Sequence, residues 1–224
     1  MRIEDYDVNF AVKTNLPTEN IVFCDVRRAP FEVCGVIHEK GCFRRMPEAI
    51  AETVSQGVLA FHRHASGGRV RFKTDSPYIA IHAKMGSIGR MRHFALCGSA
   101  GFDLYLRENS EQTYLGSYMP PLDTENIIEL SQNVGNNGLR EYIINMPLYS
   151  RVNELYIGVD KGAAIEPPEP YTIEKPVVFY GSSITQGGCA SRPGNSYQAF
   201  ISRELDCNIL ISVFPEAERQ RMKS

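Results

Sequence analysis

The sequence contains no tryptophan and only six cysteines in 224 residues, and those cysteines are widely spaced. A chain of this length can bury a core without disulfide cross-links, so we expect free thiols. No stretch reaches the roughly 18 consecutive apolar residues that a membrane span needs, and the first residues do not have the basic-then-apolar layout of a secretion signal. These absences favour a soluble, cytoplasmic chain that has no membrane partner.

Neither sign of charge is in excess. The sequence has 24 Lys and Arg against 26 Asp and Glu, which gives a formal net charge of −2. Such a chain has no overall positive field to hold phosphate backbones, so we expect no nucleic-acid partner. With 43% hydrophobic and 22% charged residues, the composition indicates a globular protein of one or two domains.

Histidine and cysteine are too sparse to indicate a metal site. Cys34, His38 and Cys42 are close in sequence, but zinc sites usually take two such pairs and no second pair is present. His62 and His64 would share one face of a strand if the strand pattern extends back to them, yet no third ligand follows from the spacing. We therefore expect no metal and no cofactor, and we interpret these two histidines as surface residues.

Alternating apolar and polar residues dominate residues 1–165. In residues 69–73 (RVRFK) the cationic side chains point one way and the apolar side chains the other. Residues 79–84, 102–106 and 155–159 show the same alternation. This period-two pattern, interrupted by turn-forming residues, predicts a β-sandwich or jelly roll of half-buried antiparallel strands.

One helix is predicted within this β-rich region, over residues 47–56. Ile50, Val54 and Val58 recur at intervals of four, which would place them on one buried face. Gly57 suits the C-terminal end of such a helix.

A proline-rich segment, residues 166–176, follows the predicted β-rich domain at 1–165. Its prolines are Pro167, Pro168, Pro170 and Pro176. Because proline stiffens the backbone and removes hydrogen-bond donors, we interpret this segment as an interdomain linker. A second domain would then occupy residues 177–224.

The second domain has an α/β pattern. Residues 177–180 (VVFY) form a short apolar run typical of a strand buried on both faces, and residues 208–214 form a second strand. Asn195 or Ser196 can cap a helix between them. The expected apolar face of this helix consists of Tyr197, Phe200, Ile201 and Leu205. The sequence thus predicts one β-α-β unit.

The segment with the clearest chemical potential is residues 181–188 (GSSITQGG), directly after the predicted strand. Small-residue turns at the C-terminal ends of strands are where open α/β sheets place ligands. Ser183 would be exposed by this turn and could attack an acyl carbon. From the residues alone, a Gly/Ser loop after a strand is more often a phosphate cradle or a plain turn than the site of a nucleophile. Cys189 lies nearby, and we interpret it as a loop or packing thiol rather than the nucleophile.

Two motifs resemble a known family. Residues 181–187 (GSSITQG) resemble the first sequence block of the SGNH/GDSL-type esterases, with Ser182 in place of the usual Asp. Residues 101–105 (GFDLY) resemble the Gly-x-Asp-Leu-Tyr signature of the β-rich domain that precedes the catalytic domain in a bacterial subgroup of that family. The resemblance implies a jelly-roll-like β-sandwich followed by an α/β, flavodoxin-like hydrolase domain.

The resemblance also implies site residues. Ser183 would be the nucleophile, and its backbone N–H would be one oxyanion donor. The family takes further oxyanion donors from later Gly and Asn blocks, and its base from a late Asp-x-x-His pair. None of these can be assigned, because all five histidines precede Ser183 and residues 215–224 are unlike the family. We therefore expect an incomplete hydrolase domain, with no catalytic His or Asp and with no activity in this chain alone.

The function implied by the resemblance is hydrolysis of a small acyl or acetyl ester, with an acylated carbohydrate as the candidate substrate. The alternative is a non-catalytic module that binds carbohydrate or a partner protein and carries a vestigial hydrolase segment. Tyr105, Tyr114 and Tyr118 could form a sugar-stacking face for such a module. The stripe at residues 69–73 could bind an acidic sugar or phosphate, but we interpret it as solvated surface.

Overall fold

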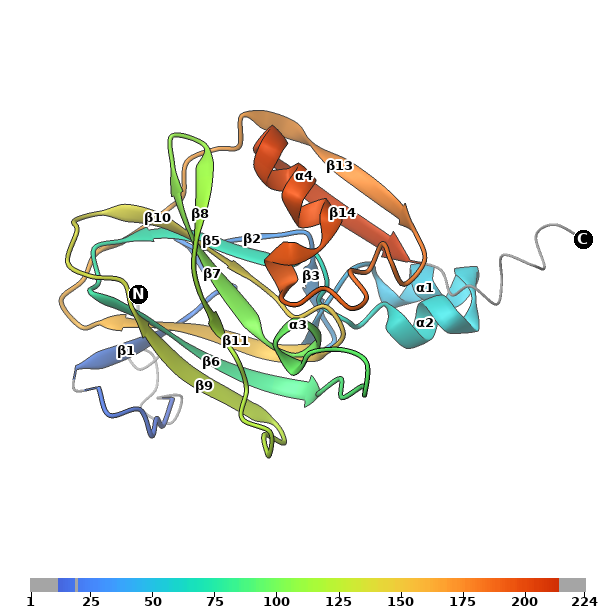
Figure 1. Ribbon diagram of the computed structural model, residues 1–224, viewed down its shortest axis with the longest axis horizontal. Coiled ribbons are helices and arrows are strands. Elements are labelled where there is room, and N and C mark those ends of the chain that lie inside the picture. Colours follow the sequence, from blue (N-terminus) through green and yellow to red (C-terminus); the bar gives the residue numbers. More distant parts are fainter. Residues whose placement is uncertain (1–11, 19, 214–224) are drawn as a thin grey trace, which may run out of the picture.

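Two antiparallel sheets form most of the computed structural model, which describes residues 12–18 and 20–213 (Figure 1). The first sheet has the order β1-β11-β6-β9; the second has the order β12-β5-β10-β7-β8, and β2 pairs with β5. The predicted mostly-β character of this region is confirmed. The strands are β1 (Ile21–Asp25), β2 (Glu32–Cys34), β5 (Arg69–Thr74), β6 (Tyr78–Ser87), β7 (Phe102–Glu108), β8 (Glu111–Tyr118), β9 (Ile127–Asn133), β10 (Arg140–Asn145), β11 (Arg151–Asp160) and β12 (Ile165–Glu166). We call this region the two-sheet part.

The inward side chains of both sheets share one core. Phe72, Leu104 and Ile144 of the second sheet are fully buried in the same apolar cluster as Ile81 and Ile157 of the first. Burying each such side chain contributes about 1.5–3 kcal/mol. The period-two pattern of the sequence therefore corresponds to a real division between core and outer faces.

The predicted helix over residues 47–56 is two helices. These are α1 (Glu48–Val54) and α2 (Gln56–Phe61). The break is at Ser55, whose hydroxyl accepts a hydrogen bond from the Val58 N–H (3.1 Å) and caps α2. Gly57 lies inside α2, so its predicted role at a helix end is wrong.

The predicted buried face of this helix is also partly wrong. Ala51 and Val58 are buried, but Ile50 is 53% exposed and Val54 41%. Since the chain bends at Ser55, residues four apart in sequence do not share one face across the two helices.

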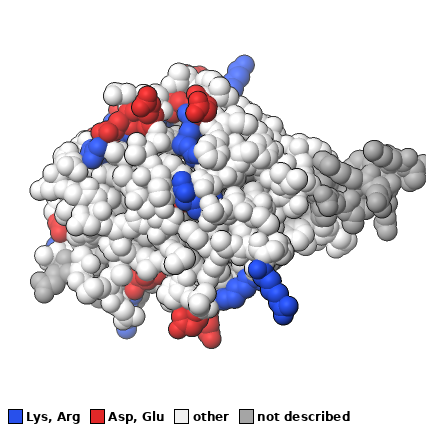
Figure 2. Space-filling view, in the orientation of Figure 1, with Lys and Arg blue, Asp and Glu red and all other residues white. Residues whose placement is uncertain are grey.

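Smaller elements flank the two sheets. The hairpin of β3 (Ile37–Glu39) and β4 (Cys42–Arg44) lies beside α1, and the short helix α3 (Leu96–Ser99) precedes β7. No helix among the described residues is long and apolar enough to cross a membrane. Figure 2 shows acidic and basic side chains in small, separate groups on one face of the molecule.

The C-terminal segment forms the predicted strand-helix-strand order. Strand β13 (Ile173–Gly181) pairs in parallel with β14 (Cys207–Val213), and α4 (Tyr197–Leu205) connects them after the 3-10 helix η3 (Pro193–Asn195). Strand β13 begins inside the segment 166–176 that we expected to be a linker. Figure 1 shows this unit against the second sheet, close to β7 and β8.

Only one face of the two-stranded sheet is covered. Ile209 and Ile211 are buried, whereas Val178 and Tyr180 are each 63% exposed and Leu210 is 38% exposed. The register pairs Val178 with Leu210, which places the exposed side chains on one outer face. The prediction of a strand buried on both faces at residues 177–180 is therefore wrong.

Helix α4 buries its small and polar side chains. Gln198 and Ser202 are buried, and the Ser202 hydroxyl donates to the Cys207 carbonyl (2.6 Å). The predicted apolar face is instead exposed or half-buried: Tyr197, Phe200, Ile201 and Leu205. The helix packs against a surface rich in polar groups, which is why its apolar stripe does not mark the buried side.

Candidate active site

Ser183 lies on a hydrogen-bonded turn that follows β13. The Gln186 N–H donates to the Ser182 carbonyl (3.1 Å), and the Gly188 N–H donates to the Ser183 carbonyl (2.9 Å). Gly187 has a φ of +93°, a conformation that suits glycine. We call residues 182–190 the serine turn.

The turn leaves Ser183 available. Its side chain is exposed, whereas the side chain of Ser182 beside it is buried. Within the described part of the chain, neither the Ser183 hydroxyl nor its backbone N–H makes a hydrogen bond. A serine in this position can present both groups to one ligand atom.

Residues of the two-sheet part hold the serine turn in place by hydrogen bonds. The Tyr149 hydroxyl donates to the Ser183 carbonyl (3.0 Å), and the Ser66 hydroxyl donates to the Gln186 carbonyl (2.7 Å). The Gln186 amide donates to the Leu148 carbonyl (2.9 Å). Residues more than 30 positions away in sequence therefore fix the backbone on both sides of Ser183.

His64 completes this set of contacts. The Gln186 amide donates to His64 Nδ1 (2.9 Å), and Arg45 donates to the other end of the same side chain (3.2 Å). The interpretation of His62 and His64 as surface residues on a strand is wrong. His62 and His64 follow α2, His62 is only 1% exposed, and its Nδ1 donates to the Leu59 carbonyl (2.6 Å).

We expect the protection of the serine turn's amide hydrogens against exchange with solvent to depend on pH. Burial lowers the pKa of His64 to about 4, from an ordinary value of 6.5. His64 accepts the Gln186 bond only when Nδ1 is unprotonated. Protection should therefore be complete above about pH 6.5 and be lost as the pH falls toward 4. The reason is that His64 binds its proton more tightly when the turn is released than when it is held.

Amide exchange of Gly187 and Gly188, corrected for the intrinsic rate, measures this effect. In the His64→Ala variant, the pH dependence of this exchange between pH 6.5 and 4 should disappear. The control variant His93→Ala, which changes an exposed histidine, should retain it. Equal pH dependence in both variants would show that His64 does not control the turn.

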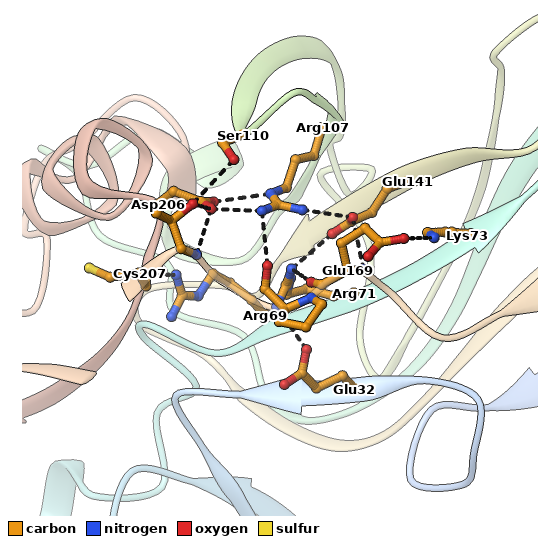
Figure 3. Close-up of polar contacts among 12 residues, drawn as sticks. Glu32, Arg69, Arg71, Lys73, Arg107, Ser110, Glu141, Glu169, Asp206 and Cys207 are labelled. Atoms are coloured by element: carbon orange, nitrogen blue, oxygen red, sulfur yellow. Dashed lines mark hydrogen bonds and ion pairs between the residues drawn. The ribbon is translucent and has the colours of Figure 1, made fainter. Parts of the chain in front are cut away.

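A buried ionic network joins the C-terminal unit to the two-sheet part (Figure 3). Arg107 of β7 donates through Nε and Nη2 to the two carboxylate oxygens of Asp206 (3.0 and 2.7 Å) and through Nη1 to Glu141 (2.9 Å). All three side chains are less than 8% exposed. Burial alone would raise the pKa of Asp206, but hydrogen bonds from Arg107 and Thr172 outweigh it and lower that pKa to about 2.

The cationic stripe at residues 69–73 belongs to this interface. Arg69 and Arg71 are 4% and 0% exposed. Arg69 donates to the Ser202 hydroxyl (2.5 Å) and to Asn208 Oδ1 (2.6 Å). The interpretation of this stripe as solvated surface is wrong, because α4 and β14 cover Arg69 and residues 169–171 cover Arg71.

The motif at residues 101–105 faces the same unit. Asp103 is fully buried and accepts hydrogen bonds from the Gly194 N–H and from Asn145 Nδ2, each at 2.7 Å. A side chain at Gly194 would lie 2.4 Å from the Tyr105 hydroxyl, so only glycine fits. Burial raises the pKa of Asp103 to about 6. The motif thus docks the loop that leads into α4.

Family models match both parts of the chain. The N-terminus of the SGNH hydrolase-type esterases, known by its GxDLY motif, matches residues 21–165. The chain belongs to this esterase family. A GDSL-like lipase/acylhydrolase model matches residues 174–214, which include the serine turn. Among curated proteins, no match was found.

Solved structures resemble this esterase-family chain over most of its length. A Bacteroides ovatus ATCC 8483 protein described as a GDSL-like lipase has 26% identity and a TM-score of 0.77, covering 88% of this chain and 57% of its own. The salicylyl-acyltransferase SsfX3 from a tetracycline biosynthetic pathway has 16% identity and a TM-score of 0.63, covering 87% and 54%. A family two carbohydrate esterase from Cellvibrio japonicus has 10% identity and a TM-score of 0.52, covering 85% and 51%. The chain therefore spans little more than half the length of these proteins.

The remaining predicted site residues do not form a second site. None of the six cysteines, all of which are among the described residues, forms a disulfide, as expected. No group of three metal-binding side chains occurs among the described residues. His38 Nε2 donates to the Asn153 carbonyl (3.0 Å), and Cys189 is exposed within the serine turn. The predicted sugar-stacking face is wrong, because Tyr105 and Tyr118 are 2% and 1% exposed.

Proposed function

We propose that Ser183 is the nucleophile of an SGNH/GDSL-type ester hydrolase. The observation that carries this proposal is an exposed serine whose hydroxyl and backbone N–H are both unengaged within the described residues, on a turn braced by Tyr149 and Gln186. The Ser183 oxygen would bond to the acyl carbon while its proton passes to a base, and its N–H would donate to the oxyanion. Departure of the alcohol leaves an acyl-serine, which water then hydrolyses.

We propose that the base is not among the 224 residues. No histidine follows Ser183 in the sequence. Of the five that precede it, four have other partners: His38 bonds to Asn153, His62 to Leu59, His64 to Gln186 and His82 to Glu129. The fifth, His93, is exposed in the turn before α3. An Asp-x-x-His pair from outside these residues would complete the triad.

The proposal includes a division of the chain into two domains. Residues 1–165 would form a jelly-roll-like domain, and 177–224 the start of a flavodoxin-like domain after the segment 166–176. The exposed outer face at Val178 and Leu210 supports a sheet that further elements cover in the complete domain.

We propose a small acyl ester, such as an acetyl group on a carbohydrate, as the substrate. The family two carbohydrate esterase from Cellvibrio japonicus supports this class through its shared fold. The rival reading, a carbohydrate-binding module without catalysis, loses its support because two of the three tyrosines in its stacking face are buried.

The direct test compares the 224-residue chain with its Ser183→Ala variant on p-nitrophenyl acetate. We expect equal rates and no labelling of Ser183 by a fluorophosphonate, because loss of the base in triad hydrolases costs on the order of 10⁶ in turnover. Faster hydrolysis by the unmodified chain would show that a base is already present, and His64→Ala would then identify or exclude His64.

A further inference from the structure

A small basic cleft is lined by residues outside the serine turn. It is bounded by the β3–β4 hairpin, α1 and the start of β11, and its volume is about 260 Å³. Four cationic side chains and one carboxylate line it: Lys40, Arg44, Arg63, Arg151 and Glu48. We call this set the basic cleft.

A tight hairpin turn positions one side of the basic cleft. Glu39 pairs with Cys42, so the connection has only two residues, and both have positive φ: Lys40 at +47° and Gly41 at +75°. This is the geometry of a type I′ turn, whose twist matches that of the strands. The turn holds the Lys40 ammonium 3.2 Å from Glu48.

Carboxylates do not balance the charge in the basic cleft. Glu48 is shared by Lys40 (3.2 Å), Arg44 (2.8 Å) and Arg63 (3.0 Å). Glu39 supplies a second carboxylate to Arg44 (3.1 Å). Arg151 has no carboxylate partner within the described residues, because its guanidinium donates to the Gly86 carbonyl (3.1 Å).

Four cations against two carboxylates leave two positive charges in excess. Burial lowers the pKa of His62 behind the cleft, so this residue adds no charge at neutral pH. Hydrogen bonds from Arg44 and Lys40 lower the pKa of Glu48 to about 2, so its charge is constant over the working range.

Burial holds the arginine side chains of the basic cleft in place. Among the described residues, the buried Nε atoms of Arg44, Arg63 and Arg151 have no hydrogen-bond partner, and Arg44 is only 1% exposed. Gly86 allows Arg151 to lie flat on β6, because a side chain at Gly86 would be 1.9 Å from Arg151 Nε. The cleft is thus a built arrangement of preorganised guanidinium groups.

We propose that the basic cleft binds a tetrahedral dianion of the phosphate or sulfate type, either free or as an ester. Two excess positive charges match one dianion, and guanidinium forks bind such oxyanions with charge-assisted hydrogen bonds. The basic cleft has no residue in common with the serine turn, and the proposal does not depend on the proposed esterase function.

Calorimetric titration of the 224-residue chain with inorganic phosphate and with sulfate, at constant ionic strength, tests the proposal. Arg63→Gln and Arg151→Gln should each weaken binding by about tenfold, because each removes one charge and one fork of donors. Arg140→Gln is the matched control, since Arg140 pairs with Glu108 on the second sheet and should leave affinity unchanged. Glu48→Gln removes a negative charge and should strengthen binding.

Parallel titrations with glucose 6-phosphate and glucose 6-sulfate distinguish the two sources. Tighter binding of an ester than of the free ion assigns the cleft to an esterified group, and the reverse assigns it to the free ion. Absence of saturable binding of all four probes up to about 10 mM would overturn the proposal. So would equal effects of Arg151→Gln and Arg140→Gln, with melting temperatures showing that every variant is folded.

Discussion

Arg107→Met is expected to lower the free energy of unfolding by about 3–5 kcal/mol. The substitution removes the shared partner of Asp206 and Glu141, whose side chains are only 6% and 4% exposed. Asp206 would then be buried without a cation, and Glu141 would keep only Arg71 (2.9 Å). Leaving a buried carboxylate without its cation costs more than the loss of a favourable contact. Urea denaturation of the variant and the unmodified chain measures the difference.

Arg140→Met provides the matched control for this experiment. Arg140 pairs with Glu108, which is 55% exposed, so the pair lies at the surface. Exposed ion pairs contribute about 0–1 kcal/mol. A loss below about 1 kcal/mol in Arg107→Met, equal to that in the control, would mean that the network does not hold the two parts together.

The destabilisation caused by Arg107→Met should diminish in acid. Asp206 has a pKa near 2 in the folded chain, below the ordinary value of 3.8. A carboxyl with a lowered pKa contributes stability that is complete above about pH 3.8 and is lost as the pH falls toward 2. The two unfolding curves should therefore converge over this range.

The sequence predicts those parts of the fold that depend on local periodicity. Alternation at residues 69–73 and 79–84 correctly separates core from outer face, because side chains of a strand necessarily alternate. The position of Ser183 after a strand also follows from local pattern, since a small-residue turn ends β13.

Contacts between distant segments were not predictable in the same way. Arg69 and Arg71 resemble solvated residues because their partners, such as Ser202 and Glu141, lie 70 or more positions away. Nothing in the local pattern indicates that Tyr149 braces the serine turn. Gln186 offered the one available signal, because a long amide side chain within a turn of small residues needs partners of its own.

The helices illustrate a second limit. The polar face of α4 is buried because Gln198 bonds to Thr185 and Ser202 bonds to Cys207 and Arg69. An apolar stripe alone therefore misplaces the helix. The motif at residues 101–105 has the same limit, because Asp103 accepts its hydrogen bond from Gly194, which is distant in sequence. The role of the GxDLY signature in docking the second unit becomes evident only when the two segments are brought together.

The proposed catalytic role of Ser183 leads to the second large effect. The serine turn supplies an exposed hydroxyl and an N–H that has no partner in residues 12–18 and 20–213. Adding a base and the remaining oxyanion donors should therefore create turnover. We propose to test this with a fusion of residues 1–213 to the part of the Bacteroides ovatus protein that this chain does not cover. A hydrolase with a complete triad should hydrolyse the ester at least about 10³-fold faster than the same protein without its nucleophile.

Hydrolysis of p-nitrophenyl acetate by this fusion, measured beside its Ser183→Ala variant, tests the central claim most directly. Both proteins should melt cooperatively, and the fusion with Ser183 should hydrolyse the ester at least about 10³-fold faster than the variant. Equal rates in two cooperatively folded proteins would show that Ser183 is not the nucleophile.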